Sequence, residues 1–248
     1  MHKQEIDYKQ FVIIVAGGLG VRMGTSTPKQ FLCINNKPIL MHTIQKFYNY
    51  NNLINIIIAL PNEHFSTWEN LCLKYNFNIK HTIISGGDTR YQSVKNGLKA
   101  ISSKGLIAVH DAVRPLVSTN LIAKCYNEAL KNDNAIPCIG VSETIREIDE
   151  NTSKQLNRNN IKLIQTPQVF DSEMLQTAYK SKFKNNFTDD ASVIERAGFK
   201  LNFIEGEKQN IKITTDLDLK LAEFYMSYKW NIKNTNKKTF SYEGLFVY

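Results

Sequence analysis

Residues 11–31 read FVIIVAGGLGVRMGTSTPKQF, and this stretch decides the fold. Phe11 to Val15 are apolar and mostly β-branched, which predicts a buried strand. Four glycines follow the strand, at positions 17, 18, 20 and 24. Glycine ends a strand and lets backbone N–H groups approach a ligand with no Cβ in the way, while Arg22 and Lys29 add two fixed cations. A buried strand that leads into such a loop is suited to hold a polyphosphate.

Other interpretations of the glycine loop fit the sequence less well or leave the cations unexplained. A glycine cluster after a strand is often only a tight turn. A P-loop would end in Gly-Lys-Ser/Thr, and Gly18-x-Gly20-x-x-x-Gly24 is one residue too long for the dinucleotide fingerprint. That fingerprint relies on a helix N-terminus and an acidic residue, whereas Arg and Lys lie inside this loop. Cations in that place are typical of phosphoryl chemistry.

Composition narrows the class of protein. A chain of 248 residues can form one large α/β domain, and its four cysteines include no C-x-x-C pair, so we expect reduced thiols. The five histidines form no zinc motif. The polar N-terminus and the absence of a long apolar run predict a soluble, cytoplasmic protein with no membrane partner.

The net charge of +8 is compatible with nucleic acid, membrane surfaces or anionic small substrates. Part of it lies near the C-terminus, because residues 226–248 contain four lysines and one glutamate. There is no RNP, zinc-finger or helix-turn-helix pattern, so we expect no nucleic-acid partner. We expect residues 1–228 to form a single domain and residues 229–248 to form a basic and aromatic tail.

Strand-like and helix-like segments alternate after the glycine loop. Strands are expected at residues 53–60, 79–84, 106–110 and 135–139, and helices at 38–47, 63–75, 89–101 and 118–130. Helical segments between strands are typical of βαβ units. The sequence therefore predicts an α/β fold with a mostly parallel sheet and helices on both faces.

Ligands bind at the carboxyl ends of the strands in such a sheet. The third expected strand after the N-terminus is followed by SGGDTRYQS at residues 85–93, where a glycine pair brings the backbone close to a ligand. The side chains there that can contact a base or ribose are Asp88, Arg90 and Ser93. Asp88 is also a suitable N-cap for the next helix, so a purely structural role stays open.

The fourth expected strand is followed by HDAVRP at residues 110–115. Asp111 can hold Mg²⁺ or a substrate hydroxyl, and Arg114 can bind a phosphate. The alternative is that the two side chains form a structural ion pair.

The α/β rhythm breaks between residues 141 and 164. Residues 143–150 alternate polar and apolar side chains, a turn follows, and residues 161–164 form a second extended run, which predicts a β-hairpin arm. Thr144 lies on the outgoing limb and Arg158 on the return limb, where an arginine is often only solubilising. A two-stranded hairpin is marginally stable alone, so we expect the arm to pack on a partner subunit.

The chain then returns to the domain at QTPQVF, residues 165–170. Ser172 is expected to cap one helix and Thr188 another, with Asp189 and Asp190 in its first turn. A substrate role for this acidic pair therefore competes with helix capping. The remaining expected elements are strands at 199–205 and 211–214 and a helix at 216–228.

Six segments, in order and spacing, resemble the 2-C-methyl-D-erythritol 4-phosphate cytidylyltransferase family of the non-mevalonate isoprenoid pathway. They are VAGGLGVRMG…PKQF (15–31), GGDTRYQSV (86–94), VHDAVRP (109–115), QTPQVF (165–170), TDDAS (188–192) and EG…NIKIT (205–214). The resemblance covers about residues 10–226, and the six segments together are far more specific than any one.

The resemblance implies a Rossmann-like nucleotidyltransferase fold and a homodimer whose 141–164 arms reach into each other's sites. The implied reaction is in-line attack by the phosphate of 2-C-methyl-D-erythritol 4-phosphate on the α-phosphate of CTP, which releases pyrophosphate. The implied cofactor is Mg²⁺, held mostly by the phosphates of CTP, with Asp111 as the one candidate protein ligand.

The resemblance also implies a role for each candidate site residue. Charge on the α-phosphate would be stabilised by Arg22 and Lys29, and the attacking phosphate would be placed by Arg158 and Lys212. The CTP phosphates and base would be lined by Ala16, Gly17, Gly18 and Gly20, and cytosine would be recognised by Gly87, Asp88 and Ser93, with Arg90 nearby. The acceptor phosphate would contact Asp111 and Arg114, and the rest of the acceptor would be surrounded by Thr144, Thr166, Thr188 and Asp189.

Three alternatives remain. A ribitol 5-phosphate (alditol-phosphate) cytidylyltransferase shares the glycine loop, HDAVRP and NIKIT, although GGDTR and TDDAS look more like the methylerythritol enzymes. A sugar-1-phosphate nucleotidyltransferase would need a longer chain and a second metal carboxylate. A non-catalytic nucleotide- or nucleic-acid-binding protein would explain the charge, but not why Lys29, Arg158 and Lys212 should converge.

Overall fold

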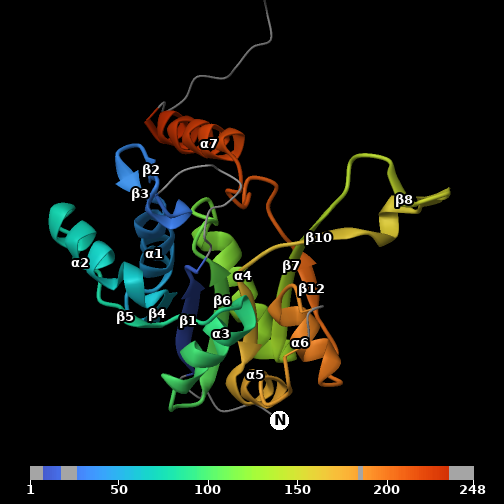
Figure 1. The fold of residues 1–248 in the computed structure, drawn as a ribbon, viewed down its shortest axis with the longest axis horizontal. Helices are drawn as coiled ribbons and strands as arrows, with labels where there is room; N and C mark the ends of the chain where they lie inside the picture. The colour runs from blue at the N-terminus through green and yellow to red at the C-terminus, as the bar shows by residue number, and fades with distance from the viewer. Residues whose placement is uncertain (1–7, 18–26, 184–186, 235–248) are drawn as a thin grey trace, which may run out of the picture.

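A computed structural model describes residues 8–17, 27–183 and 187–234, with residues 228–234 described by their backbone alone. Its centre is an eight-stranded sheet in the order β10-β7-β11-β6-β1-β4-β5, with β12 paired to β7 (Figure 1). The strands are β1 (Lys9–Val15), β4 (Asn55–Leu60), β5 (Thr82–Ser85), β6 (Gly105–Asp111), β7 (Asn134–Gly140), β10 (Lys162–Ile164), β11 (Gln168–Asp171) and β12 (Phe203–Glu205).

One half of the sheet is parallel, as the alternating pattern predicts. β1 lies between β4 and β6, and Val15 at its end is opposite Ala59 of β4 and Asp111 of β6. The carboxyl ends of these strands therefore meet at one edge. The other half is mixed, because β11 runs antiparallel between β6 and β7, and β10 is antiparallel to β7.

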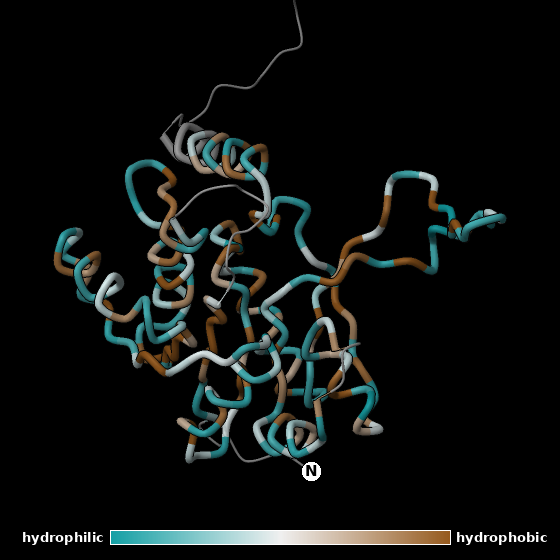
Figure 2. The backbone as a smooth tube through the Cα atoms, viewed as in Figure 1, coloured by the Kyte–Doolittle hydropathy of each residue, from teal (hydrophilic) through white to brown (hydrophobic). Residues whose placement is uncertain are grey.

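Helices cover both faces of the sheet, as expected. One face carries α1 (Ile39–Tyr50), α2 (Phe65–Lys74) and α4 (Thr119–Asn132), and the other carries α3 (Arg90–Lys99), α5 (Ser172–Ala178) and α6 (Asp190–Arg196). Successive side chains of β1 enter opposite cores, since Ile14 packs with Phe47 of α1 and Ile13 with Val94 of α3. Figure 2 shows the apolar stretches concentrated in these central strands.

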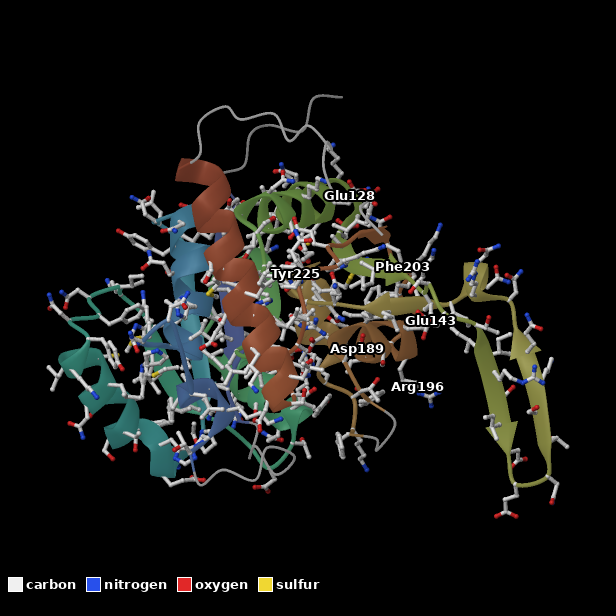
Figure 3. The ribbon with its side chains drawn as sticks, turned by 90° about the horizontal axis from the view of Figure 1, so that it is seen from above. Glu128, Glu143, Asp189, Arg196, Phe203 and Tyr225 are labelled. Carbon is white, nitrogen blue, oxygen red and sulfur yellow. The ribbon has the colours of Figure 1, made fainter. Side chains whose placement is uncertain are left out.

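The arm is a two-stranded hairpin of β8 (Ile145–Asp149) and β9 (Thr152–Leu156), and it projects from the body of the molecule (Figures 1 and 3). The prediction that residues 161–164 form its return limb is wrong. Leu163 of β10 pairs instead with Ile139 of β7 in the main sheet. β10 is joined to the sheet by its backbone pairing with β7, although its Leu163 is 53% exposed. The exposed β9 has no apolar pattern by which the sequence would reveal it.

Several boundaries also differ from the expectations. Asp171, rather than Ser172, caps α5, because its carboxylate accepts hydrogen bonds from the backbone N–H groups of Glu173 and Met174. Residues 211–214 form no strand, and 199–205 contribute only the short β12. The last described helix, α7 (Asp216–Asn234), is longer than predicted. The remaining short elements are η2 (Lys29–Phe31), β2 (Cys33–Ile34), β3 (Lys37–Pro38), η3 (Asn62–His64) and η4 (Arg158–Asn160).

Gly97 allows α3 to lie close against β1. A Cβ built on Gly97 would lie 2.8 Å from Cγ2 of the fully buried Ile13. Alanine favours a helix over glycine by about 1 kcal/mol, but overpacking a core costs about 1–3 kcal/mol. We therefore expect Gly97→Ala to lower the free energy of unfolding, by up to about 2 kcal/mol, in urea titrations.

The matched control for this substitution is Gly140→Ala, because a Cβ on Gly140 meets no atom within 4 Å. Its free energy of unfolding should change by no more than about 0.5 kcal/mol. A Gly97→Ala protein more stable than the unmodified chain would contradict the close packing of α3 on β1, because it would show the helix preference of alanine with no steric cost.

Candidate active site

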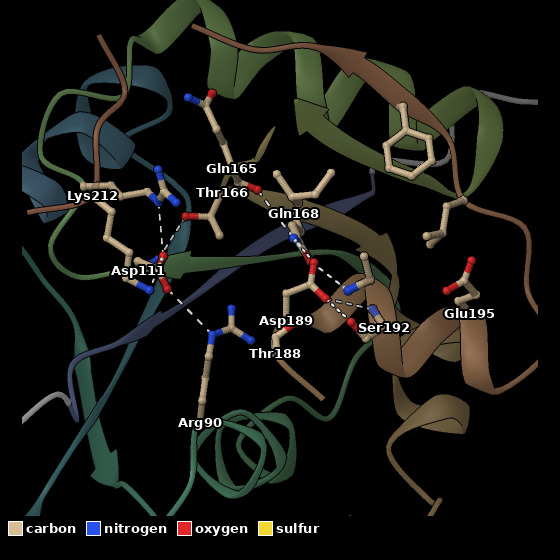
Figure 4. A pocket seen from close by; sticks show the side chains of 15 residues that line it. Arg90, Asp111, Gln165, Thr166, Gln168, Thr188, Asp189, Ser192, Glu195 and Lys212 are labelled. Atoms are coloured by element: carbon tan, nitrogen blue, oxygen red, sulfur yellow. Dashed lines mark hydrogen bonds and ion pairs between the residues drawn. The ribbon is translucent and has the colours of Figure 1, made fainter. Parts of the chain in front are cut away.

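Two cavities lie at the edge where the parallel strands end. The first, which we call the β1 cavity, has a volume of about 290 Å³ and is lined by Ala16, Gly17, Lys29, Gly87, Asp88 and Ser93, among others. The second, the α6 cavity, has a volume of about 430 Å³ and is lined by Arg114, Thr166, Gln168, Thr188 and Asp189, among others (Figure 4). Arg90, Asp111 and Lys212 line both cavities. These three residues form a shared wall.

Asp111, the last residue of β6, is the charged centre of this wall. Arg114 Nε and Lys212 Nζ each lie 3.1 Å from its Oδ2, and Arg90 Nε lies 3.6 Å from its Oδ1. Burial would raise the pKa of Asp111, but the cations of Arg90, Lys212 and Arg114 outweigh it and hold the pKa well below its usual range. The ion pair with Arg114 that the sequence left open is therefore present, as part of a larger cluster.

His110 and Thr166 fix the backbone that carries Asp111. Thr166 Oγ1 accepts a hydrogen bond from the Asp111 N–H at 3.1 Å and lies 3.0 Å from His110 Nδ1. Burial lowers the pKa of His110 to about 3, so the ring is neutral at physiological pH. Nδ1 then accepts from the Thr166 hydroxyl, and Nε2 donates to the Arg114 carbonyl 3.2 Å away. The sequence pattern indicates no role for His110, although this residue lies inside the HDAVRP segment.

Lys29 lies in η2 and reaches into the β1 cavity with 8% of its surface exposed. Its Nζ lies 3.5 Å from the Thr214 carbonyl oxygen. Two residues on, Phe31 stacks on the fully buried Trp68, with ring centroids 6.3 Å apart. This packing anchors η2 on α2 and so holds the ammonium group of Lys29 at the β1 cavity.

The loop before α3 is arranged by its own side chains. Thr89, rather than Asp88, is the N-cap of α3, because its hydroxyl accepts from the Gln92 N–H. Ser93 Oγ accepts from the Gly87 N–H at 3.0 Å and lies 3.0 Å from the Thr89 carbonyl. The exposed Asp88 carboxylate therefore faces the β1 cavity without a capping role.

In the loop before α6, unlike the loop before α3, an acidic side chain does cap the helix. Asp189, rather than Thr188, caps α6 by accepting from the Ser192 N–H and hydroxyl, and Gln168 Nε2 donates to its other oxygen at 2.9 Å. Asp190 is fully buried and its Oδ2 lies 2.6 Å from Arg90 Nη2. Thr188 is exposed at the α6 cavity. The predicted cap, Thr188, is therefore wrong by one residue, and Asp190 lies in the first turn as expected but is paired with Arg90.

Residues outside the predicted set also support the α6 cavity. Arg114 Nη1 donates to the Asn210 carbonyl at 2.8 Å, and Asn210 Nδ2 donates to the Thr166 carbonyl at 2.8 Å. Gln165 Nε2 donates to the Glu207 carbonyl. These amides join the turn between β10 and β11 to the segment that carries Lys212. Their only sequence signal is their place in the QTPQVF and EG…NIKIT segments.

Thr144 and Arg158 are brought together on the arm, not at the two cavities. Both line a separate hollow of about 620 Å³ between β8 and η4. Arg158 Nη1 donates to the Ser142 carbonyl at 2.6 Å. Within one chain, these two of the residues expected at the acceptor therefore lie on the arm, and neither lines the β1 cavity or the α6 cavity. The arm itself projects from the body of the molecule (Figure 3).

Three predicted residues, Gly18, Gly20 and Arg22, lie outside the described part of the chain. Among the residues that are described, no group of three or more His, Cys, Asp or Glu side chains is placed to hold a metal ion. Within the same residues, no helix is long and apolar enough to cross a membrane.

Comparison with known proteins connects this geometry to one family. The model of the IspD family, described as 2-C-methyl-D-erythritol 4-phosphate cytidylyltransferase, matches residues 10–228. The protein of that name from Bacteroides fragilis is 49% identical over 210 residues, which are 85% of this chain and 96% of the relative. The one from Porphyromonas gingivalis W83 is 40% identical over 223 residues, 90% of this chain and all of the relative.

Solved structures agree with the sequence matches. The 2-C-methyl-D-erythritol 4-phosphate cytidylyltransferase of Francisella tularensis superposes with a TM-score of 0.72 at 35% identity, covering 87% of this chain and 99% of that one. The 4-diphosphocytidyl-2C-methyl-D-erythritol synthase of Anaerococcus prevotii gives a TM-score of 0.75 at 28% identity, with 89% and 99% covered. The Rossmann-like nucleotidyltransferase fold is confirmed, and the chain belongs to the 2-C-methyl-D-erythritol 4-phosphate cytidylyltransferase family.

Proposed function

We propose that this protein transfers the cytidylyl group of CTP to 2-C-methyl-D-erythritol 4-phosphate. An oxygen of the acceptor phosphate attacks the α-phosphorus of CTP, the bond from that phosphorus to the bridging oxygen breaks, and pyrophosphate leaves with the bond's electron pair. One observation carries the proposal: two cavities share a wall of Arg90, Asp111 and Lys212, so two phosphorylated substrates can meet across it. Membership of the family supports methylerythritol phosphate over ribitol phosphate as acceptor.

In this proposal CTP occupies the β1 cavity. Asp88 and the backbone of Gly87 recognise cytosine, and Ser93 holds the loop in shape through the Gly87 N–H. Ala16 and Gly17 lie beside the phosphates, as we also propose for Gly18, Gly20 and Arg22. Lys29 stabilises the negative charge that develops on the α-phosphate in the transition state. Its anchoring through Phe31 supports this role, because a fixed cation needs no reorganisation during the reaction.

The acceptor occupies the α6 cavity. Its phosphate lies beside Arg114 and Lys212, which Asp111 orients, and its hydroxyl groups lie near Thr166, Thr188 and Asp189. Positioning and electrostatic stabilisation are sufficient apparatus for this chemistry, because phosphoryl-type transfer needs no protein nucleophile.

Mg²⁺ is the proposed cofactor, carried by the triphosphate of CTP. Asp111 fits poorly as its ligand, because the two oxygens of this carboxylate already face Arg90, Arg114 and Lys212. The proposed reaction therefore has no step that depends on a metal held by Asp111. We further propose that the enzyme works in the cytoplasm, where its thiols (Cys33, Cys72, Cys125 and Cys138) stay free.

The arm is proposed to complete the site of a second copy in a homodimer. Thr144 and Arg158 are exposed on a hairpin that projects from its own body and lacks a core of its own. The partner's α6 cavity would give the hairpin a surface to pack on, and the acceptor phosphate bound there would contact Arg158. We also propose that residues 1–228 act as one catalytic domain, with 229–248 as an appended tail.

The proposed function is tested by pyrophosphate release from CTP and Mg²⁺, measured in parallel with 2-C-methyl-D-erythritol 4-phosphate and ribitol 5-phosphate. We expect release with the first acceptor and a kcat/KM at least about 100-fold lower with the second, because a site built for the substrate's own hydroxyl groups discriminates strongly. Faster release with ribitol 5-phosphate, or release with neither acceptor, would overturn the proposal.

Lys29→Ala tests the electrostatic role of this side chain. Removal of one preorganised charge-stabilising group typically costs about 10²–10³ in kcat, and we expect a loss of that size with an unchanged circular dichroism spectrum. Lys124→Ala, on the exposed side of α4, is the matched control and should keep wild-type turnover. Wild-type turnover in Lys29→Ala would rule out the assignment.

Arg158→Ala tests the arm. It should raise KM for the acceptor more than KM for CTP. When the Arg158→Ala and Lys29→Ala proteins are unfolded, mixed in equal amounts and refolded together, activity should return. About half of randomly formed dimers then contain one chain of each kind, and one of the two sites in such a dimer is intact, so about a quarter of all sites are active. Activity equal to the sum of the two separate proteins would show that the arm does not act on a partner's site.

A further inference from the structure

Arg90 connects the two cavities more directly than the other residues of their shared wall. It is the first residue of α3, directly after the loop that lines the β1 cavity. Its guanidinium spans two carboxylates, with Nη2 2.6 Å from Asp190 Oδ2 and Nε 3.6 Å from Asp111 Oδ1. One of these carboxylates ends β6 and the other begins α6, next to the loop that lines the α6 cavity. Arg90 therefore joins both substrate loops.

Asp190 depends on this contact. Its side chain is fully buried, Arg90 lies beside its Oδ2, and the Tyr179 hydroxyl donates to its Oδ1 at 2.7 Å. A buried carboxylate without a cation beside it is strongly unfavourable. A displacement of Arg90 would therefore disturb Asp190 and, with it, the adjoining residues Thr188 and Asp189.

Tyr91, the neighbour of Arg90, makes a second connection to the same segment. Its hydroxyl donates to the Ser181 carbonyl at 2.6 Å, and its ring stacks on Tyr179 with centroids 4.6 Å apart and on Phe187 with centroids 5.8 Å apart. The first turn of α3 therefore holds the chain on both sides of the acceptor loop. A shift of this turn when a nucleotide contacts Gly87 or Asp88 would be transmitted to Thr188 and Asp189.

We propose that Arg90 is a positioning residue that couples the two cavities, so that occupation of one by nucleotide strengthens binding of the acceptor phosphate in the other. This inference rests on the proposed function. Linkage requires the effect to be reciprocal, so the acceptor must strengthen nucleotide binding by the same factor. Arg90 acts through Asp111 and Asp190 rather than on the reacting atoms.

The test is a calorimetric measurement of the Kd of cytidine 5′-(α,β-methylene)triphosphate, whose α-to-β bridge cannot be cleaved. It is made with Mg²⁺, in the absence and in the presence of saturating 2-C-methyl-D-erythritol 4-phosphate. We expect the acceptor to lower this Kd by a factor in the usual range of allosteric coupling, about 5–150-fold. In Arg90→Lys the factor should fall to about one, because an ammonium group is a point charge and does not span two carboxylates as a guanidinium does.

Two further variants separate coupling from folding. Arg196→Lys is the matched control, because this exposed arginine lies on α6 and lines neither cavity, and it should keep the wild-type factor. Asp190→Asn keeps an oxygen for the Tyr179 hydroxyl and removes the charge, so the acceptor should no longer lower the Kd of the nucleotide in this variant either. This variant replaces Arg90→Lys if the Arg90→Lys protein does not fold.

The outcomes separate this inference from the proposed function. A wild-type factor of one, or a wild-type factor retained in a folded Arg90→Lys or Asp190→Asn protein, would overturn the coupling while both ligands still bind. Weaker binding of both ligands with an unchanged factor would show that Arg90 is only structural. If the wild-type protein bound neither the nucleotide analogue nor the acceptor, the proposed function itself would fail, and the coupling with it.

Discussion

The site depends on one buried carboxylate at the end of a parallel strand. Asp111 ends β6, and the cations around it come from the start of α3, from the loop after β6 and from the segment after β12. An arginine or lysine alone in these positions would be free to turn toward water. Held against Asp111, the three side chains have fixed directions toward the two cavities. The Asp111 carboxylate thus reduces the net positive charge of the site and at the same time fixes the positions of the three cations.

The sheet explains why these distant segments meet. β1, β4, β5 and β6 are parallel, so the loops that follow β1, β5 and β6 all emerge at one edge. β11 then enters beside β6 in the opposite direction and brings Thr166 to the Asp111 backbone. The parallel half of the sheet gathers the loops of the β1 cavity, and the antiparallel strand supplies a wall of the α6 cavity. The mixed sheet therefore places two different cavities side by side.

Much of the fold and part of the site could be predicted from the sequence. The apolar run of β1 and the strand–helix alternation give the parallel half, because buried strands and amphipathic helices have strong periodicity. The polar strand β9 has no such pattern, and the mistaken return limb of the arm follows from that. Helix caps were misplaced by one residue at Ser172 and Thr188, because Asp, Ser and Thr are all good caps and stand next to one another in the chain.

Arg90 is an example of a residue whose contacts could not be predicted from the sequence. In the sequence it is one polar residue among several after a glycine pair, and nothing local indicates that its partner lies 100 residues away at Asp190. A contact of that separation follows only from the tertiary fold, which brings the first residues of α3 and α6 together. The same holds for His110, whose neutral ring is explained by burial that no sequence pattern reveals. Residues that touch ligands are marked by loop composition, whereas residues that hold those loops in register are defined by tertiary contacts.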